Sequence, residues 1–518
     1  GPINEAFPGL TTFRGNASRT YYGEGPVPRR PVVLWRYPAG GAMCSASTVG
    51  GETKTWCGTG WTGQPNVIER PDGTLEVRFG AYDGRYHFLD GRTGEPLRPD
   101  LVTGDLAKGS ATSDPDGYPL YYAGSRDDLF RIVALDREAP TVLWTLDGET
   151  SVPDPVWNDD WDGAALVVDD HLFVGGENSW FYAVRLHRGY DRRGRVRVDP
   201  EVVAAVPGFD DELLRSLGDT DVSIEGSVAF HRGVVYFANS GGLVQGWDVS
   251  DVLAGGDRVR RVFRFWAGDD VDATVVIDEE GFLYVGAELQ RFNRRGLEVG
   301  QLMKLDPRRR RDPLVWSIPI EERGLDGLAG VWATPALHGE VLYEATHAGE
   351  LLAVDRGRGR VLWRLRLPGP TWSSPVVVDD VLIQGDCAGV LHAYDVSRPR
   401  RPPRELWQLQ LGGCIESTPA VWRGMIFVGT RAGAFYAIGD RRAARGLEAS
   451  GPAAGATGPF QARTYAAPAR PLPAHRGGSA AGVLLAPDPQ DLVPDLSAGG
   501  PDHDHLPRSP SEQRRAHR

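Results

Sequence analysis

The sequence repeats itself, and this repeat restricts the possible folds more than any other feature. Three similar stretches each open around a proline, at residues 333–355, 373–395 and 417–440. The prolines, at positions 335, 375 and 419, are 40 and 44 residues apart, a period typical of one β-propeller blade. Apolar residues alternate in three short runs of each stretch, and a fourth run carrying Leu-Trp follows the first two stretches. This alternation predicts blades of four antiparallel strands.

The ending of the third run can be followed through the chain. It reads Ala-x-Asp or a close variant and recurs at eight positions: Asp90, Asp136, Arg185, Asp248, Asp306, Asp355, Asp395 and Asp440. The Trp of the fourth run recurs at Trp144, Trp316, Trp363 and Trp407, and Phe263 takes that place in the fourth repeat. The sequence therefore predicts an all-β protein, an eight-bladed propeller of four-stranded antiparallel blades.

The last repeat stops at Asp440 without a fourth run, and a spare copy of that run, VVLWRYPAG, occupies residues 32–40. We expect this N-terminal strand to complete the last blade, because closing the ring removes exposed sheet edges. The chain then divides into an N-terminal extension (residues 1–31), the propeller (residues 32–440) and a C-terminal tail (residues 441–518). The tail is rich in Ala, Pro, Gly and Arg, a composition that predicts disorder.

Charge and cysteine content narrow the classes of function. A net charge of −12 argues against a nucleic-acid-binding surface, which needs clustered cations. The sequence has no run of 18 apolar residues, so no membrane span is predicted. Cys44 and Cys57 flank one loop, and Cys387 and Cys414 lie in neighbouring repeats, without the spacing of zinc ribbons or c-type haem sites. Two disulfides in a secreted or cell-envelope protein are predicted, with four reduced core thiols as the alternative.

Two insertions stand outside the repeat. Residues 189–217 contain PGFDDELLRSL, which predicts a short helix between the third and fourth strands of a blade or beside them. Residues 53–65, TKTWCGTGWTGQP, form a loop rich in glycine and aromatic residues before the first inner strand. We expect this loop to cover part of the channel mouth, where Trp56 and Trp61 either contact a ligand or pack as ordinary core.

The residue just before each innermost strand is expected to lie at one height around the central channel. Alignment of the repeats assigns this position to Lys108, Asp162, Glu225, Asp272, Trp332, Trp372 and Glu416, with the first repeat contributing a residue between 62 and 64. Carboxylates brought together raise one another's pKa unless a cation joins them, and Ca²⁺ takes six to eight oxygen ligands. Asp162, Glu225 and Asp272 are therefore candidate metal ligands. Capping of turns with a solvated channel lining is the alternative for the acidic residues, and core packing is the alternative for the tryptophans.

The Ala-x-Asp, Gly and Leu-Trp pattern of residues 32–440 resembles the repeat of the pyrroloquinoline-quinone (PQQ) dependent alcohol dehydrogenases, which the outer-membrane assembly scaffold BamB shares. The resemblance implies PQQ in the central funnel beside Ca²⁺ or a lanthanide. Asp272 would then be the general base and also a metal ligand together with Glu225 and Asp162. Lys108, Trp332, Trp372 and Glu416 would contact the cofactor. The adjacent Cys-Cys pair often found over PQQ and a haem-binding motif are both missing.

Three functions follow as hypotheses. The leading one is a quinoprotein-like oxidoreductase of the cell envelope or exterior that oxidises an alcohol, sugar or aldehyde, since a pure scaffold has no need of a carboxylate-rich channel. The alternatives are a non-catalytic scaffold with envelope protein partners, and a propeller that binds a small ligand or metal without redox chemistry. The sequence names neither a substrate nor an electron acceptor, so a PQQ-dependent enzyme and a non-catalytic protein both stay open as interpretations.

Overall fold

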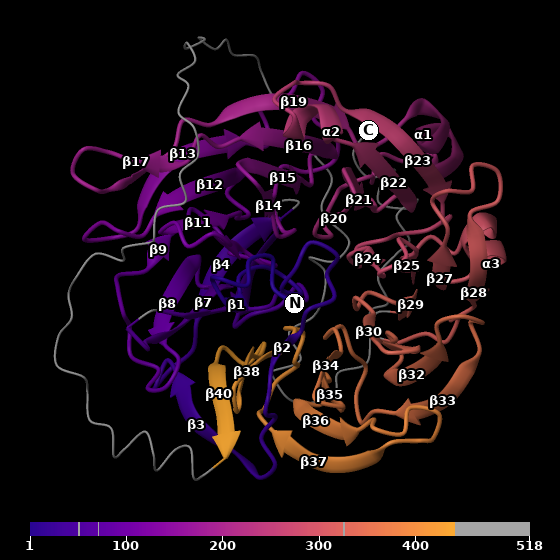
Figure 1. The fold of residues 1–518 in the computed structure, drawn as a ribbon. Coiled ribbons are helices and arrows are strands. Elements are labelled where there is room, and N and C mark those ends of the chain that lie inside the picture. The colour runs from indigo at the N-terminus through magenta and orange to yellow at the C-terminus, as the bar shows by residue number, and fades with distance from the viewer. Residues whose placement is uncertain (50–51, 71, 325–326, 441–518) are drawn as a thin grey trace.

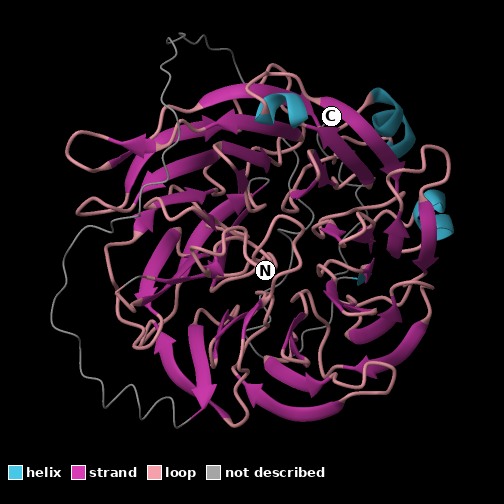
Figure 2. Ribbon diagram, in the orientation of Figure 1, coloured by secondary structure: helices cyan, strands magenta, loops and turns pink. Residues whose placement is uncertain are grey.

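Eight β-sheets surround one axis like the blades of a propeller (Figure 1). The computed structural model describes residues 1–440 except 50–51, 71 and 325–326. The predicted tail, residues 441–518, lies outside the described residues. Figure 2 shows strands and loops almost throughout, with the short helices at the outer rim. The predicted eight-bladed, all-β architecture is confirmed.

The strands of the first four blades are given in their order within each sheet. Blade 1 contains β1 (Gly9–Leu10), β6 (Asn66–Glu69), β7 (Leu75–Ala81), β8 (Arg85–Asp90) and β9 (Leu101–Val102). Blade 2 contains β10 (Thr112–Ser113), β11 (Leu120–Ala123), β12 (Leu129–Ala134) and β13 (Thr141–Asp147). Blade 3 contains β14 (Leu166–Val168), β15 (His171–Gly175), β16 (Trp180–Arg185) and β19 (Glu201–Pro207). Blade 4 contains β20 (Ala229–His231), β21 (Val234–Phe237), β22 (Leu243–Asp248) and β23 (Arg260–Trp266).

The other four blades follow the same plan. Blade 5 contains β24 (Val276–Ile277), β25 (Leu283–Gly286), β27 (Leu302–Leu305) and β28 (Leu314–Ile318). Blade 6 contains β30 (Ala336–His338), β31 (Val341–Ala345), β32 (Glu350–Asp355) and β33 (Val361–Arg366). Blade 7 contains β34 (Val376–Val378), β35 (Val381–Gly385), β36 (Val390–Asp395) and β37 (Arg404–Gln410). Blade 8 contains β2 (Gly23–Glu24), β38 (Ala420–Trp422), β39 (Met425–Gly429), β40 (Phe435–Asp440) and β3 (Pro31–Tyr37).

Strand β3 closes the ring, as the sequence predicts. It pairs antiparallel with β40, from Pro31 opposite Asp440 to Tyr37 opposite Phe435. Its Trp35 donates the indole N–H to the carbonyl oxygen of Gly91 in blade 1, at 2.9 Å. The outer-strand tryptophans Trp316 and Trp363 likewise each donate to a backbone carbonyl of the following blade, at 2.9 Å. The repeated Trp therefore joins neighbouring blades, because its indole both buries apolar surface and makes one directional bond.

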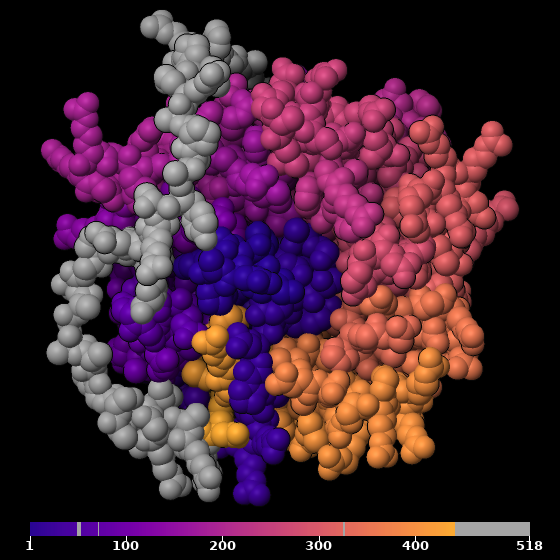
Figure 3. Space-filling view, viewed as in Figure 1, coloured from indigo at the N-terminus to yellow at the C-terminus, as the bar shows by residue number. Residues whose placement is uncertain are grey.

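Residues 9–24, which we call the N-terminal plug, close one end of the central channel. The plug begins as β1 on blade 1 and ends as β2, which pairs in parallel with β38 of blade 8. Between them, Ala17 and Ser18 accept backbone hydrogen bonds from Phe230 and Ile277 in the inner-strand regions of blades 4 and 5. Figure 3 shows the earliest residues of the chain filling the middle of this face.

Two buried arginines fasten the plug. Arg19 donates to the carbonyl oxygens of Val228 (2.6 and 2.8 Å) and Phe13 (2.7 Å), and Arg14 donates to that of Thr334 (2.5 Å). Burial lowers the pKa of Arg19 to about 9. Because these guanidinium groups satisfy backbone carbonyls of several blades, the plug belongs to the folded core rather than lying outside it.

The remaining strands and helices lie outside the eight blade sheets. The two-stranded pairs are β4 (Cys44–Val49) with β5 (Glu52–Cys57), β17 (Gly189–Tyr190) with β18 (Val196–Arg197), and β26 (Glu288–Leu289) with β29 (Ala329–Gly330). The helices are α1 (Asp211–Leu217), α2 (Ser250–Leu253) and α3 (Arg294–Val299). Helix α1 is the predicted helix, capped by the Asp210 side chain, and it follows the fourth strand of its blade. Within the described part of the chain, none of the helices has the length and hydrophobicity that crossing a bilayer requires.

Both predicted disulfides are present. Cys44 is bonded to Cys57 across the β4–β5 pair, and Cys387 is bonded to Cys414 between blades 7 and 8. The alternative of four reduced thiols is therefore wrong.

Candidate functional site

The seven residues aligned at the blade entrances form a buried ring around the axis. Each lies four residues before an inner strand, since β10, β14, β20, β24, β30, β34 and β38 begin at residues 112, 166, 229, 276, 336, 376 and 420. Thr62 holds the equivalent place before β6 in blade 1. None of the seven side chains is more than 6% exposed, counting Lys108, Asp162, Glu225, Asp272, Trp332, Trp372 and Glu416.

Lys108 forms ion pairs with one group of carboxylates at this ring. Its Nζ lies 3.1 Å from Asp160, 3.3 Å from Asp162 and 3.0 Å from Glu177. Asp162, Glu177 and Glu225 each present a carboxylate oxygen within 4.8 Å of the others, and we call them the Lys108 triad. Burial alone would raise the pKa of Glu177, but the nearby ammonium of Lys108 outweighs burial and lowers this pKa to about 2. For Asp162, burial dominates and raises the pKa well above its usual range. The three carboxylates of this triad therefore already have a cation beside them, the ammonium group of Lys108.

A second group of carboxylates lies where blades 4 and 5 meet the axis. Asp270, Asp272 and Glu288 each present an oxygen within 4.8 Å of the others, and we call them the acidic triad. They are 2%, 6% and 1% exposed. Ser240 donates its hydroxyl to Asp272 Oδ1 at 2.8 Å, but the buried Asp270 Oδ1 accepts no hydrogen bond from any residue that the structure describes. A buried oxygen without a donor is costly. Oxygens of Asp160 and Asp162 also lack a hydrogen bond, but the Lys108 ammonium lies 3.1 and 3.3 Å from these two carboxylates, whereas Asp270 has no such ammonium contact among the described ion pairs.

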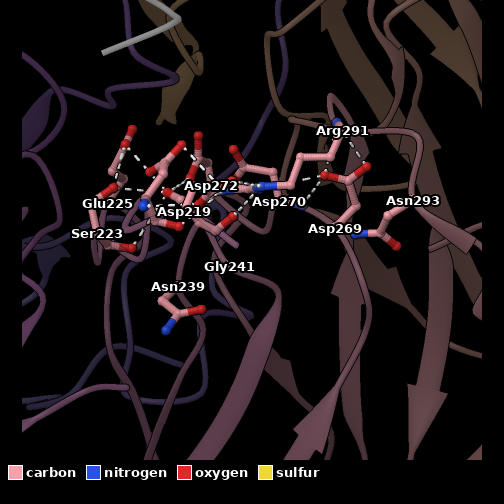
Figure 4. Close-up of polar contacts among 12 residues, drawn as sticks. Asp219, Ser223, Glu225, Asn239, Gly241, Asp269, Asp270, Asp272, Arg291 and Asn293 are labelled. Carbon is pink, nitrogen blue, oxygen red and sulfur yellow. Dashed lines mark hydrogen bonds and ion pairs between the residues drawn. The ribbon is translucent and has the colours of Figure 1, made fainter. Parts of the chain in front are cut away.

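Arg291 extends toward this region, as Figure 4 shows. Its guanidinium forms ion pairs with Asp219 (3.1 Å), Asp221 (3.4 Å) and Asp269 (3.6 Å). Burial raises the pKa of Asp221 to about 7 and the pKa of Asp270 well above its usual range. The carboxylates in this region outnumber the one guanidinium of Arg291, and burial favours the neutral forms of Asp221 and Asp270.

Trp61, from the loop between β5 and β6, lies at the centre of the ring. Its indole N–H donates to Glu225 Oε2 at 3.1 Å, and Lys108 Nζ lies 4.1 Å from the centre of its ring system. The Trp332 ring meets the Trp61 ring edge to face, with 5.5 Å between the ring centres, and the Trp372 ring meets the Trp332 ring with 4.7 Å between centres. The predicted loop thus fills the funnel at its centre.

Trp372 and Glu416 contact groups outside the ring. Trp372 donates to His347 Nδ1 at 2.6 Å, and His347 Nε2 lies 2.5 Å from Glu288 Oε2 in the acidic triad. Glu416 forms an ion pair with Arg431 at 2.9 Å, and Arg431 lies over the Tyr82 ring at 4.7 Å. Glu416 therefore belongs to a separate polar cluster.

The sequence interpretation missed several residues of the site, and they share one position. Glu177, Glu288, His347 and Arg431 each lie two residues after the end of a second strand, since β15, β25, β31 and β39 end at residues 175, 286, 345 and 429. Alignment of the second-strand ends would have revealed this second ring.

A small cavity beside the ring tests what the site can hold. It has about 10 Å³ of room for the centre of a water-sized sphere, roughly what one water molecule needs. Its lining includes Phe13, Trp61, Asp162, Glu225, Asp272 and Trp332. A tricyclic quinone does not fit this space while Trp61 lies in the ring. A hard cation fits the chemistry of the acidic triad, because three carboxylate oxygens within 4.8 Å of one another suit ligands that are each about 2.3–2.6 Å from one ion.

Comparisons with known proteins agree with this architecture. The profile of the family described as outer membrane protein assembly factor BamB matches residues 300–401. The quinohemoprotein alcohol dehydrogenase of Comamonas testosteroni is 12% identical, with a TM-score of 0.50 over 83% of this chain and 80% of its own. The quinohemoprotein alcohol dehydrogenase ADHIIG of Pseudomonas putida HK5 is 10% identical, with a TM-score of 0.54 over the same shares. No curated protein sequence matches the chain. At these identities the structural similarity shows the fold and not the activity.

The protein is therefore an eight-bladed propeller that shares its fold with the quinohemoprotein alcohol dehydrogenases, and its residues 300–401 are similar to the repeat of the family described as outer membrane protein assembly factor BamB.

Proposed function

We propose that this propeller acts outside the cytoplasm and binds a hard cation, of the Ca²⁺ or lanthanide class, at the acidic triad. The observation that carries the proposal is the buried Asp270 Oδ1, which accepts no hydrogen bond from the described residues and lies beside the carboxylates of Asp272 and Glu288. Burial raises the pKa of Asp270 well above its usual range, and a bound cation would give this oxygen a partner and favour its charged form.

The choice between the two triads rests on charge. Asp162 and Glu225 lie in the triad that Lys108 already serves, with contacts of 3.0–3.3 Å to Glu177, Asp160 and Asp162. A second cation there would be repelled by the ammonium group. Of the three metal ligands expected from the sequence, we therefore assign Asp272 to the cation and add Asp270 and Glu288.

An extracytoplasmic location is proposed from the cysteines. The two disulfides, Cys44–Cys57 and Cys387–Cys414, take up the four cysteines of the chain. Disulfides persist in oxidising compartments and are rare in the cytosol.

A quinoprotein-like oxidoreductase is the second candidate, favoured by the fold shared with the quinohemoprotein alcohol dehydrogenases. PQQ would supply the redox chemistry that oxidises an alcohol, sugar or aldehyde. Asp272 would hold the proton removed from the substrate hydroxyl, and Lys108, Trp332, Trp372 and Glu416 would bind the cofactor. This function requires the Trp61 indole to leave the ring, because it contacts Lys108, Glu225 and Trp332.

A scaffold with envelope protein partners is the third candidate. The family profile that matches residues 300–401 favours it, since that family is described as an assembly factor. A scaffold alone would give the acidic triad no role, so cation binding separates this candidate from the first.

A terbium titration of the full chain tests the proposal. Protein stripped with a chelator is titrated with Tb³⁺, and emission excited through the nearby tryptophans is followed, with Ca²⁺ as competitor. We expect one saturable site, weakened at least about tenfold in both Asp270→Asn and Asp272→Asn, since each removes one anionic ligand.

Two matched variants make the titration decisive. Asp162→Asn removes a carboxylate from the Lys108 triad, and Asp72→Asn removes one from an exposed turn. Both are expected to keep the affinity of the unmodified chain. Absence of a saturable site, or a loss confined to Asp162→Asn, would overturn the proposal. Circular dichroism of each variant separates lost binding from lost folding.

A further inference from the structure

We infer that Trp61 takes the place of a planar cofactor in this propeller, so that the chain completes its own ring with an indole and holds no quinone there. The inference does not depend on cation binding at the acidic triad. It rests on the contacts of Trp61, on the conformation of the loop that carries it, and on the N-terminal plug beside it.

Three blades meet on the Trp61 indole. Lys108 at the entrance of blade 2 places its ammonium 4.1 Å from the indole centre. Glu225 of blade 4 accepts the indole N–H at 3.1 Å, and Trp332 of blade 6 meets the ring edge to face at 5.5 Å. Because these blades are distributed around the axis, a side chain that touches all three entrances lies on the axis itself. The indole receives a cation, an acceptor and an aromatic neighbour, the kinds of contact that a bound planar ligand would need.

The backbone that carries Trp61 is held in an unusual conformation. Trp61 and Thr62 have φ values of 56° and 50°, a left-handed region that non-glycine residues seldom adopt. Such conformations persist where the surroundings impose them. Here, a Cβ on Gly60 would lie 2.2 Å from Glu416 Oε2, and Thr418 donates its backbone N–H to the Gly63 carbonyl oxygen. Neighbouring blades therefore fix the loop in the form that directs Trp61 inward.

The N-terminal plug closes the axis on one side of the indole. Phe13 of the N-terminal plug lines the same one-water cavity as Trp61, so plug and loop face each other across that cavity. Behind Phe13, Arg14 and Arg19 fasten the plug to backbone carbonyls of several blades. The start of the Trp61 loop is held as well, because the Cys44–Cys57 disulfide comes just before it in the chain and Gly58 donates its backbone N–H to the Met43 carbonyl oxygen. A planar ligand would have to displace Trp61 to reach the ring.

The first test uses the unmodified chain, so it does not depend on the folding of a variant. The full chain is titrated with PQQ in the presence of Ca²⁺, and quinone absorbance and tryptophan fluorescence are followed. We expect no saturable change in either signal. Stoichiometric binding of PQQ would overturn the inference and would support the oxidoreductase candidate. Failure of the terbium titration would leave the inference intact, which keeps the two proposals distinguishable.

The second test removes the Trp61 side chain and leaves a cavity in its place. Trp61→Ala should lower the midpoint of thermal unfolding by roughly 5 °C, the size expected for a large buried cavity in a domain of this length. Added indole should bind the variant and restore part of that loss, because the cavity keeps Lys108, Glu225 and Trp332 as its walls.

The matched control is Trp56→Ala. Trp56 is in the preceding strand and is 3% exposed, but it packs against Tyr82 and Arg431 rather than on the ring. Its variant should lose comparable stability and gain nothing from indole. Indole that stabilises both variants equally, or a Trp61→Ala variant as stable as the unmodified chain, would contradict the inference.

Discussion

Trp372 donates its indole N–H to Nδ1 of His347 over 2.6 Å, and this bond fixes the tautomer of the histidine. An indole nitrogen can only donate, so Nδ1 must accept and the ring proton of neutral His347 sits on Nε2. Nε2 lies 2.5 Å from Glu288 Oε2. His347 therefore connects the tryptophans of the ring to the acidic triad and orients the Glu288 carboxylate.

Replacement of His347 is expected to weaken cation binding. His347→Ala removes the donor that orients Glu288, and loss of such a supporting partner typically costs 10–100-fold in metal affinity. We expect at least a tenfold weaker Tb³⁺ affinity in the titration described above. His347→Gln keeps one acceptor and one donor and should recover part of the loss, which a purely steric role would not explain. The partly exposed His338 supplies the control variant His338→Ala, and equal affinities in both alanine variants would refute this role.

The N-terminal plug is expected to contribute to global stability through Arg19. Its guanidinium satisfies the carbonyl oxygens of Phe13, Ala164 and Val228, and Arg19→Ala would leave these buried acceptors without a donor. Such losses cost about 1–3 kcal/mol for each unsatisfied group. Denaturant unfolding should show a free energy of unfolding at least about 2 kcal/mol lower than that of the unmodified chain. Arg192→Ala, at an exposed hairpin tip, should leave it unchanged, and a similar value for both variants would argue that the plug is dispensable.

The positions that the sequence predicted are those that the repeat determines. Propeller symmetry converts an alignment of repeats into places around an axis, so the blade number, the closing strand β3 and the ring residues all follow from the period. The seven ring residues keep one register because each stands four residues before its inner strand. The roles of these side chains do not follow from symmetry, since Lys108 and Trp332 occupy equivalent places and make different contacts.

The positions that the sequence did not predict depend on contacts outside the repeat. The plug has no alternating pattern of its own, and its stability comes from Arg14 and Arg19, which look like ordinary surface residues in the segment FRGNASRT. The place of Trp61 depends on two left-handed residues held by Gly60 and its neighbours, and local sequence does not specify that conformation. Long-range packing selected both features over local preference.

The disulfide between blades 7 and 8 is expected to stabilise the region of ring closure. Cys387 and Cys414 are 27 residues apart, and the chain-entropy relation gives about 3.5 kcal/mol for a loop of that length. The double variant Cys387→Ser, Cys414→Ser should therefore unfold at lower denaturant concentration, with blade 8 as the first to gain hydrogen exchange. The pair Cys44→Ser, Cys57→Ser closes a shorter loop of 13 residues and should cost less, about 3 kcal/mol. The opposite order of effects would show that strain or residual structure outweighs chain entropy.

Stability is also expected to depend on pH through His87, far from the acidic triad. Its Nδ1 lies 3.0 Å from Asp100 and its Nε2 lies 3.1 Å from Asp83, while Tyr37 and Phe79 pack against the ring. Burial alone would lower the pKa of His87, but the two carboxylates outweigh burial and raise the pKa to about 9. Because the folded state holds this proton more tightly than the unfolded chain, the added stability is complete below pH 6.5 and is lost as the pH rises through 9.

Urea unfolding at several pH values measures this contribution. The free energy of unfolding should fall by up to about 3 kcal/mol between pH 6 and pH 10 because of this one group, at about 1.4 kcal/mol for each unit of pKa. Other groups titrate over the same range, so the informative quantity is the difference between the unmodified chain and His87→Gln. That difference should be largest near pH 6 and smallest at pH 10. A difference that stays constant from pH 6 to pH 10 would mean that His87 stabilises the blade by packing and not by its charge.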